Sequence, residues 1–221
     1  MDRTGIVNDD VDYRDYEPIH PKGTDWRGRL KRIAGPLAGA GIVLAKWSII
    51  LLKFSTIFIA VAAYALIWGW RFAAGLVLLI LLHESGHYIE ARREGLSPKL
   101  PVFVPFLGAY VQYTRGNPWQ TARVAIAGPI LGGIASLACY ALAQAQNSDL
   151  LSALAYFGFL LNLFNLIPVG ILDGGAVWRS ARYLRLGGAP EKATIIYTIY
   201  FATAIALAIG MWASHVPQHR L

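Results

Sequence analysis

The stretch LLHESGHYIEARR, which runs from Leu81 to Arg93, places histidines and glutamates at the end of an apolar run that begins at Phe72. A helix that crosses a bilayer needs about 20 predominantly apolar residues, and ionisable side chains inside it are costly and usually functional. Here His83, Glu84 and His87 form the pattern HExxH. The stretch therefore predicts a membrane helix whose polar residues have a role that offsets the cost of burying them.

The composition of the whole chain supports a membrane protein. Of its 221 residues, 56% are hydrophobic and only 15% are charged, and the mean hydropathy is +0.45. A soluble domain usually has about 25% charged residues and shorter apolar runs. The formal net charge is +7. We do not interpret it as a sign of nucleic-acid binding, because the basic residues lie between the apolar runs, where they orient helices and meet anionic lipid headgroups.

Five apolar segments define the predicted architecture, an all-α polytopic membrane protein with about five transmembrane helices. The predicted spans are 54–70, 72–89, 124–143, 150–168 and 194–213. Lysine and arginine are concentrated in the connections on one side of these spans, which predicts a cytoplasmic amino terminus and an external carboxyl terminus. In this orientation the histidines of the HExxH pattern lie towards the cytoplasmic side, and we expect the membrane to be a bacterial inner membrane.

The remaining segments are assigned from their composition. Residues 1–34 are polar, and we expect a cytoplasmic tail without a signal peptide. Residues 35–53 predict an amphipathic helix at the membrane interface, because two lysines seven residues apart share one helix face. A true span is the alternative for this segment. The membrane core is then 54–213, followed by a short tail at 214–221.

The HExxH pattern is a zinc-binding arrangement when it lies on a helix. Residues four apart face the same way, so the imidazoles of His83 and His87 can reach one Zn²⁺ ion. Glu84 then lies beside the metal and suits a general base that takes a proton from zinc-bound water. The alternative is a pair of histidines that are hydrogen-bonded inside a helix bundle. The membrane context favours the metal, because a cation satisfies both imidazoles and gives Glu84 a positive neighbour.

A catalytic zinc ion also needs a third protein ligand and an open position. Glu90 is seven residues from His83, about 10 Å along a helix axis, and Glu94 is farther, so we expect both at the cytoplasmic headgroups. Asp149 is predicted at the opposite membrane face. Asp173 is the best candidate, because it follows a proline and a glycine that break the helix within FNLIPVGILDGG. The alternative for Asp173 is a helix-capping role in a cytoplasmic turn.

Together, HESGH and FNLIPVGILDGG resemble the motifs of the site-2 protease family of intramembrane zinc metalloproteases. The resemblance covers 54–213 and implies His83, His87 and Asp173 as zinc ligands. It implies Glu84 as the catalytic base for hydrolysing peptide bonds in or near a membrane-spanning helix. We therefore expect a compact zinc endopeptidase without PDZ or CBS domains. Its expected partners are a transmembrane protein substrate and the lipid bilayer, with no nucleic acid.

Two further features are candidates for contact with the substrate. Asn165 falls where this family has an asparagine, and its amide could hold a substrate strand or a developing oxyanion; Asn162, one turn earlier, is the second candidate. The connection 98–113 favours extended structure, and in this family it forms a membrane-dipping β-loop whose edge can pair with an unwound substrate. An interfacial loop without substrate contact is the alternative. We assign Gly128 and Gly132 to helix packing rather than to chemistry.

Two other functions stay open from the residues alone. A non-proteolytic membrane adaptor would keep zinc as a structural clamp with a closed fourth coordination position. A zinc transporter would need a chain of metal ligands across the membrane, whereas the sequence offers a single cluster of them.

Overall fold

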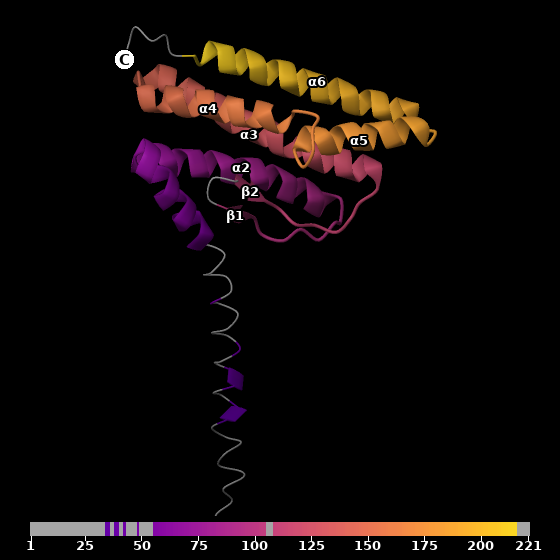
Figure 1. Cartoon of the computed structure of the whole chain (residues 1–221), viewed down its shortest axis with the longest axis horizontal. Helices are drawn as coiled ribbons and strands as arrows, with labels where there is room; N and C mark the ends of the chain where they lie inside the picture. Colours follow the sequence, from indigo (N-terminus) through magenta and orange to yellow (C-terminus); the bar gives the residue numbers. More distant parts are fainter. Residues whose placement is uncertain are drawn as a thin grey trace, which may run out of the picture. The chain divides into compact units, whose positions relative to one another are not determined.

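The computed structural model describes residues 34–35, 38–39, 42, 48, 55–104 and 108–215. Within these residues the chain forms a set of long helices and one short β-hairpin (Figure 1). The helices are Ser55–Trp68, α2 (Trp70–Arg93), α3 (Pro118–Gln146), α4 (Asp149–Asn165), α5 (Asp173–Leu186) and α6 (Pro190–Ala213). The hairpin consists of β1 (Val102–Val104) and β2 (Gly108–Tyr110), which pair antiparallel between α2 and α3.

The apolar helices coincide in sequence with the predicted spans. α2, α3 and α6 are each long and apolar enough to cross a membrane, while Ser55–Trp68 and α4 are apolar but shorter. The prediction of a mostly helical membrane protein is therefore confirmed, and the count of about five spans stays a prediction. The amphipathic helix predicted at 35–53 lies outside the described residues, apart from a few single positions.

The end of α2 shows why the helix stops just beyond the HExxH pattern. Gly95 has a φ of 75°, a conformation that is favourable only for glycine. Its N–H donates to the Arg92 carbonyl at 3.1 Å, and the N–H of Leu96 donates to the Ala91 carbonyl at 2.8 Å. These two bonds form a Schellman motif, which satisfies carbonyls left over at the helix end. The chain then turns back towards the hairpin.

α3 is the central helix, because α2, α4, α5 and α6 all pack against it. It begins with a capping box, in which Asn117 and Gln120 exchange side chain-to-backbone hydrogen bonds of 3.0 Å. Two hydrophobic clusters fill the interior. One lies where α3, α4, α5 and α6 meet, and the other joins Ser55–Trp68 with α2, α4 and β1. Large apolar side chains such as Leu66 point outward, as they do on a lipid-facing surface.

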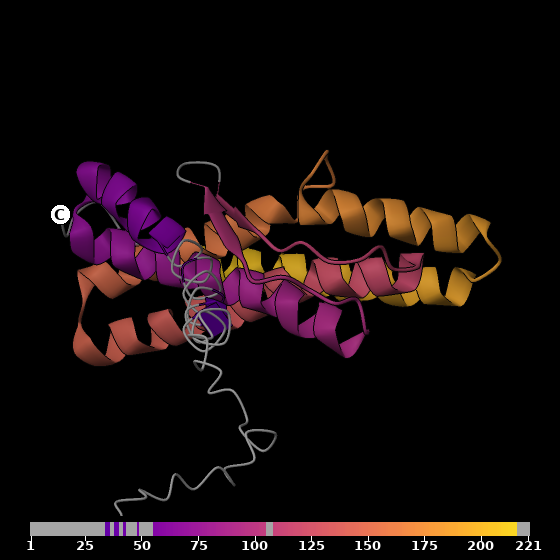
Figure 2. The same ribbon diagram turned by 90° about the horizontal axis from the view of Figure 1, so that it is seen from below.

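The break after α4 is the feature that most affects the site. α4 ends at Asn165, residues 166–172 form a non-helical loop, and Asp173 begins the new helix α5 (Figure 1). The sequence predicts this break but no span directly after it, so α5 is a correction. In Figure 2 this loop and the β-hairpin project to the same side of the helices.

Candidate metal centre

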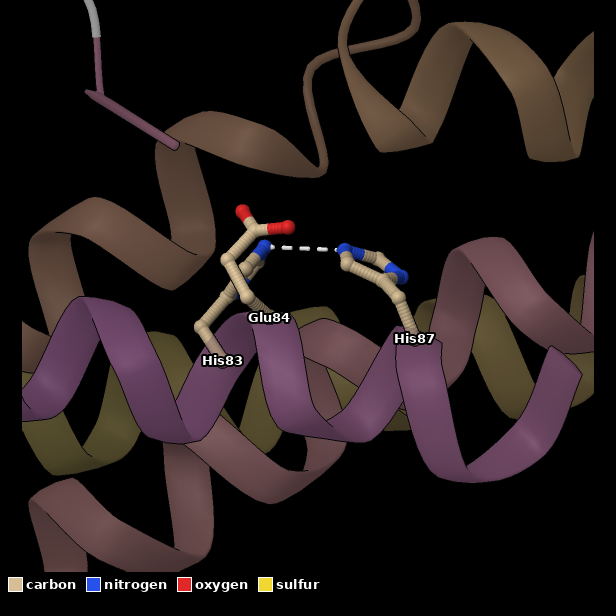
Figure 3. A group of neighbouring side chains, drawn as sticks. All are labelled: His83, Glu84 and His87. Carbon is tan, nitrogen blue, oxygen red and sulfur yellow. Dashed lines mark hydrogen bonds between the residues drawn. The ribbon is translucent and has the colours of Figure 1, made fainter. Parts of the chain in front are cut away.

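The two histidines and the glutamate of the HExxH pattern point from one face of α2 into the protein (Figure 3). All three side chains are buried, with exposed fractions of 3% for His83, 6% for Glu84 and 7% for His87. The two Nε2 atoms, joined by the dashed line, lie 3.1 Å apart. A carboxylate oxygen of Glu84 lies within 4.8 Å of the imidazole nitrogens. One turn of α2 thus gathers three potential metal ligands in a buried site.

Asp173 completes the group from the first turn of α5. Its Oδ2 atom lies 3.2 Å from Nε2 of His83 and 3.3 Å from Nε2 of His87. The three atoms therefore form a nearly equilateral triangle. A tetrahedral Zn²⁺ ion with bonds of about 2.0–2.1 Å holds its ligand atoms about 3.3–3.4 Å apart. This spacing fits a single ion, of whose four tetrahedral positions these three atoms would take three.

The hydrogen bonds behind the histidines determine which ring nitrogens face the centre. Nδ1 of His83 donates to Oδ1 of Asn162 at 2.7 Å, and Nδ1 of His87 donates to the carbonyl of Val124 at 2.8 Å. A neutral imidazole has one N–H, so neither Nε2 then has a hydrogen to donate. Oδ2 of Asp173 is buried without a hydrogen-bond partner. Three acceptor atoms facing one another are unfavourable unless a cation lies between them, so the donor set fits a metal.

The loop before α5 is held in place by contacts that deliver Asp173 to the histidines. The hydroxyl of Tyr200 on α6 donates to the carbonyl of Leu166. Gly174 packs so closely that a Cβ atom on it would overlap the same carbonyl oxygen. At the other end of the loop, Arg179 donates to the carbonyl of Gly170 at 2.8 Å. The glycine that follows Asp173 is therefore required by close packing against the loop.

The small residues of α3 make room for the candidate ligands. A Cβ atom on Gly128 would overlap the imidazole of His87, and one on Gly132 would overlap the side chain of Asn162. On α2, a Cβ atom on Gly86 would overlap the Ala127 carbonyl oxygen. These glycines do pack helices, as the sequence predicts, but two of the groups they accommodate belong to the site. Gly128 and Gly132 therefore contribute both to helix packing and to the space that the candidate site needs.

Replacing Gly128 with alanine is therefore expected to weaken metal binding. The new methyl group displaces the His87 imidazole, and overpacking of this kind lowers the free energy of unfolding by about 1–3 kcal/mol. Gly133→Ala is the matched control, because its methyl group meets only Leu207 Cδ2, at 2.7 Å, near the flexible end of a side chain. Competition with a metal-sensitive dye measures the affinity. Equal affinities in the two variants would contradict the contact between Gly128 and His87.

The other carboxylates near the end of α2 are paired with arginines. Glu90 accepts from Arg123 of α3 at 2.6 Å and lies 3.8 Å from Arg93. Glu94 also pairs with Arg123. From the sequence, Glu90 and Glu94 are excluded as ligands because of their distance along the helix, and both are expected at the cytoplasmic headgroups. Arg123 was missed as a partner, because it lies on another helix.

Tyr113 adds a polar group from the connection between β2 and α3, where it packs against Ala91, Leu96 and Val124. Burial, with a further contribution from the negative charge of Asp173, raises the pKa of the Tyr113 hydroxyl above its ordinary value. The phenol therefore stays protonated to a higher pH than an ordinary tyrosine does.

Comparison with known proteins places this arrangement in a family. The family model described as Peptidase family M50 matches residues 71–148 and 138–208. The chain belongs to peptidase family M50. The matched residues include both sequence motifs and all of the elements from α2 to α5 that build the site. The resemblance to site-2 proteases is thereby confirmed.

Individual relatives of this M50 chain are distant. It is 32% identical over 124 residues to "Putative zinc metalloprotease sll0528" of Synechocystis, covering 51% of this chain and 33% of that protein. It is 26% identical over 182 residues to "Putative zinc metalloprotease Rip3" of Mycobacterium tuberculosis, covering 71% of this chain and 46% of that protein. The chain thus spans a third to a half of these relatives' length. A solved structure, the site-2 protease from Methanocaldococcus jannaschii, aligns with a TM-score of 0.47 and 19% identity, over 76% of this chain and 90% of that one.

The two asparagines of α4 in this M50 chain differ in their surroundings. Asn165 is partly exposed at the end of the helix, and its Nδ2 donates to the Leu161 carbonyl at 3.1 Å. Asn162 is 1% exposed and contacts His83. From the sequence, Asn162 is expected only as a second candidate for substrate contact, so its contact with His83 was missed. The signal available in the sequence was a polar amide inside an apolar segment, three residues before the end of α4.

Proposed function

We propose that this chain is a zinc-dependent intramembrane endopeptidase, which hydrolyses peptide bonds in or near transmembrane segments of membrane proteins. The observation that carries the proposal is the triangle of acceptor atoms from His83, His87 and Asp173 in a buried site on the membrane helix α2. Two imidazoles, a carboxylate and an open position are the donor set of a catalytic zinc site. A fourth position that stays open to water would distinguish this function from a non-proteolytic adaptor with a closed zinc clamp.

When bound, zinc polarises the scissile carbonyl group and lowers the pKa of a water molecule at the site. Glu84 is the general base. It takes the proton from the attacking water and later passes it to the leaving amine. Its carboxylate lies beside the two imidazoles, with an oxygen within 4.8 Å of their nitrogens (Figure 3). In this mechanism the protein supplies the proton transfers and the position of the reacting groups.

Asn165 is proposed to bind the substrate beside this site. Its NH₂ group has two hydrogens, and the bond to the Leu161 carbonyl uses one of them. The other can donate to a substrate carbonyl or to the oxyanion that develops during attack. Asn165 ends α4 where the helix breaks, so a substrate strand could approach it without being blocked by another turn of helix.

The β-hairpin is proposed to hold the substrate in an extended form. A helix shields its own peptide bonds, so a transmembrane substrate must unwind locally before it is cut. A two-stranded hairpin has an outer edge on each strand. On β1 the N–H of Phe103 already donates to Thr56 Oγ1 at 3.4 Å, so the edge of β2 is the one proposed to pair with such a segment. We further propose that the chain lies in a bacterial inner membrane with its amino terminus in the cytoplasm, so that water reaches the site from that side.

Metal removal tests this proposal. Comparative membrane proteomics of cells with the wild type and cells with an inactive variant identifies single-span proteins that accumulate uncut. With such a protein in liposomes, treatment of the purified wild type with 1,10-phenanthroline is expected to abolish cleavage, and added Zn²⁺ is expected to restore it. Mg²⁺ should not restore cleavage, because it prefers six oxygen ligands. Cleavage that survives complete removal of zinc would contradict a zinc mechanism.

A further inference from the structure

Asn162 is the most buried polar side chain next to the candidate metal centre. Its exposed fraction is 1%, and both ends of its amide are used. Nδ2 donates to the Gly158 carbonyl within α4 at 2.7 Å, and Oδ1 accepts from Nδ1 of His83 at 2.7 Å. The first bond determines the orientation of the amide, so the oxygen must face His83. One hydrogen of its NH₂ group is left over, but at an exposed fraction of 1% the amide is enclosed by protein rather than open to a substrate.

The bond to Asn162 settles the tautomer of His83. Because Oδ1 can only accept, the hydrogen of the imidazole is on Nδ1, and the lone pair of Nε2 points towards Asp173. His87 has the same arrangement with the backbone carbonyl of Val124 as its acceptor. An acceptor behind a ligating histidine fixes the ring and increases its basicity. The two ligands differ in that only His83 depends on a side chain for this support.

The position of Asn162 is determined by its neighbours on two helices. Within α4, the Gly158 carbonyl accepts a hydrogen bond from Nδ2 of Asn162. On the other side, α3 lies so close that a Cβ atom on Gly132 would overlap the amide. Alternative side-chain orientations are therefore restricted. Val124 is also on α3, so this helix supports both histidines, one through its carbonyl and the other through the packing of Asn162.

We propose that Asn162 is a positioning residue for the metal centre, which holds His83 in the tautomer and orientation that present Nε2 to the ion. This inference rests on the proposed function, because it assumes that His83 binds zinc. It changes the role of Asn162 from substrate contact to support of a ligand, and it leaves Asn165 as the α4 asparagine that can face the substrate. Loss of such a hydrogen-bond partner typically weakens metal binding by about 10–100-fold.

The test compares variants that keep or remove the acceptor. Asn162→Leu has nearly the same shape and no acceptor, and we expect its zinc affinity to fall by about 10–100-fold. Asn162→Asp keeps an oxygen that can face His83 but loses the donor to the Gly158 carbonyl, so we expect its zinc affinity to fall by less than that of Asn162→Leu, since carboxylates are common partners of ligating histidines. Ser136→Ala is the matched control, because it removes another buried hydrogen bond, to the Gly132 carbonyl, without contacting a ligand. Affinity is measured on the full chain in detergent by competition with a chelator.

Spectroscopy gives a readout that a general loss of stability would not change. Replacing zinc with Co²⁺ makes the coordination geometry visible in the absorption spectrum, and we expect an altered spectrum for Asn162→Leu but a spectrum like the wild type for Asn162→Asp and Ser136→Ala. If Asn162→Leu does not fold, Asn162→Ala repeats the test with a side chain too small to overlap α3. Wild-type affinity and spectrum in the acceptor-less variant would overturn the proposal.

A His83→Ala arm separates this inference from the function on which it rests. If His83→Ala loses zinc while the acceptor-less Asn162 variant keeps it, the ligand set stands and the role of Asn162 is wrong. If His83→Ala keeps full zinc affinity, the ligand set itself is wrong, and the positioning role is overturned with it. Loss of affinity in both, with rescue by Asn162→Asp, is the result that the proposal predicts.

Discussion

Glu84→Gln is expected to keep the metal and to lose about 10²–10⁴-fold in the rate of peptide hydrolysis, the usual contribution of a general base. Glutamine has nearly the same shape as glutamate, but its amide cannot take a proton from water. The three atoms that form the metal triangle come from other residues, so the substitution leaves them in place. An unchanged zinc content combined with a large loss of rate is therefore the specific expectation.

The measurement is single-turnover cleavage of a membrane-tethered substrate by purified protein, with zinc determined in the same samples. Glu191→Gln is the control, because it removes a carboxylate from the exposed first turn of α6, away from the site. That variant should cleave at the wild-type rate. Retained cleavage by zinc-loaded Glu84→Gln would mean that another group accepts the proton, and the assigned mechanism would be wrong.

Asp173→Ala is expected to lose both zinc and activity. The variant removes one of the three proposed protein ligands, so its zinc affinity should fall by more than the about 10–100-fold typical of outer-shell partners. It also leaves the two Nε2 atoms of His83 and His87 facing each other without the carboxylate that lies 3.2–3.3 Å from them. A pair of imidazoles alone cannot provide the three-ligand set of a catalytic site.

Asp149→Ala is the matched control for this variant. Asp149 is the exposed first residue of α4, at the opposite end of that helix from the break that leads to Asp173. Its loss removes a favourable charge at a helix start, which is typically worth about 0.3–1 kcal/mol. The number of zinc ions per chain is measured by mass spectrometry after dialysis. It should stay near one in Asp149→Ala and fall in Asp173→Ala. An unchanged zinc affinity in Asp173→Ala would remove that residue from the ligand set.

The sequence was sufficient to predict features that depend on one helix or on hydropathy. His83 and His87 share a face because they are four residues apart, and the apolar runs mark the long helices because lipid requires continuous apolar surface. Asp173 could be found because it combines an acidic group with a helix break on the expected membrane side. These are local patterns, and the structure brings His83, His87 and Asp173 together.

Features that depend on how two helices meet could not be predicted in the same way. Asn162 lies 79 residues from His83, and no local period connects them. The role of Gly128 depends on which ring of α2 lies opposite it. α5 was missed because Gly174 and Gly175 are poor helix formers. They are tolerated at its start because α5 packs closely against the loop before it, where a larger residue would overlap.

The most direct test of the account is to map where the chain cuts a single-span substrate in liposomes. Wild-type protein loaded with zinc should produce new termini within or next to the membrane-spanning segment, as identified by mass spectrometry of both products. The Glu84→Gln protein, with equal zinc, should leave the same substrate intact. An intact substrate after incubation with zinc-loaded wild type, or cuts confined to regions far from the membrane, would contradict an intramembrane endopeptidase.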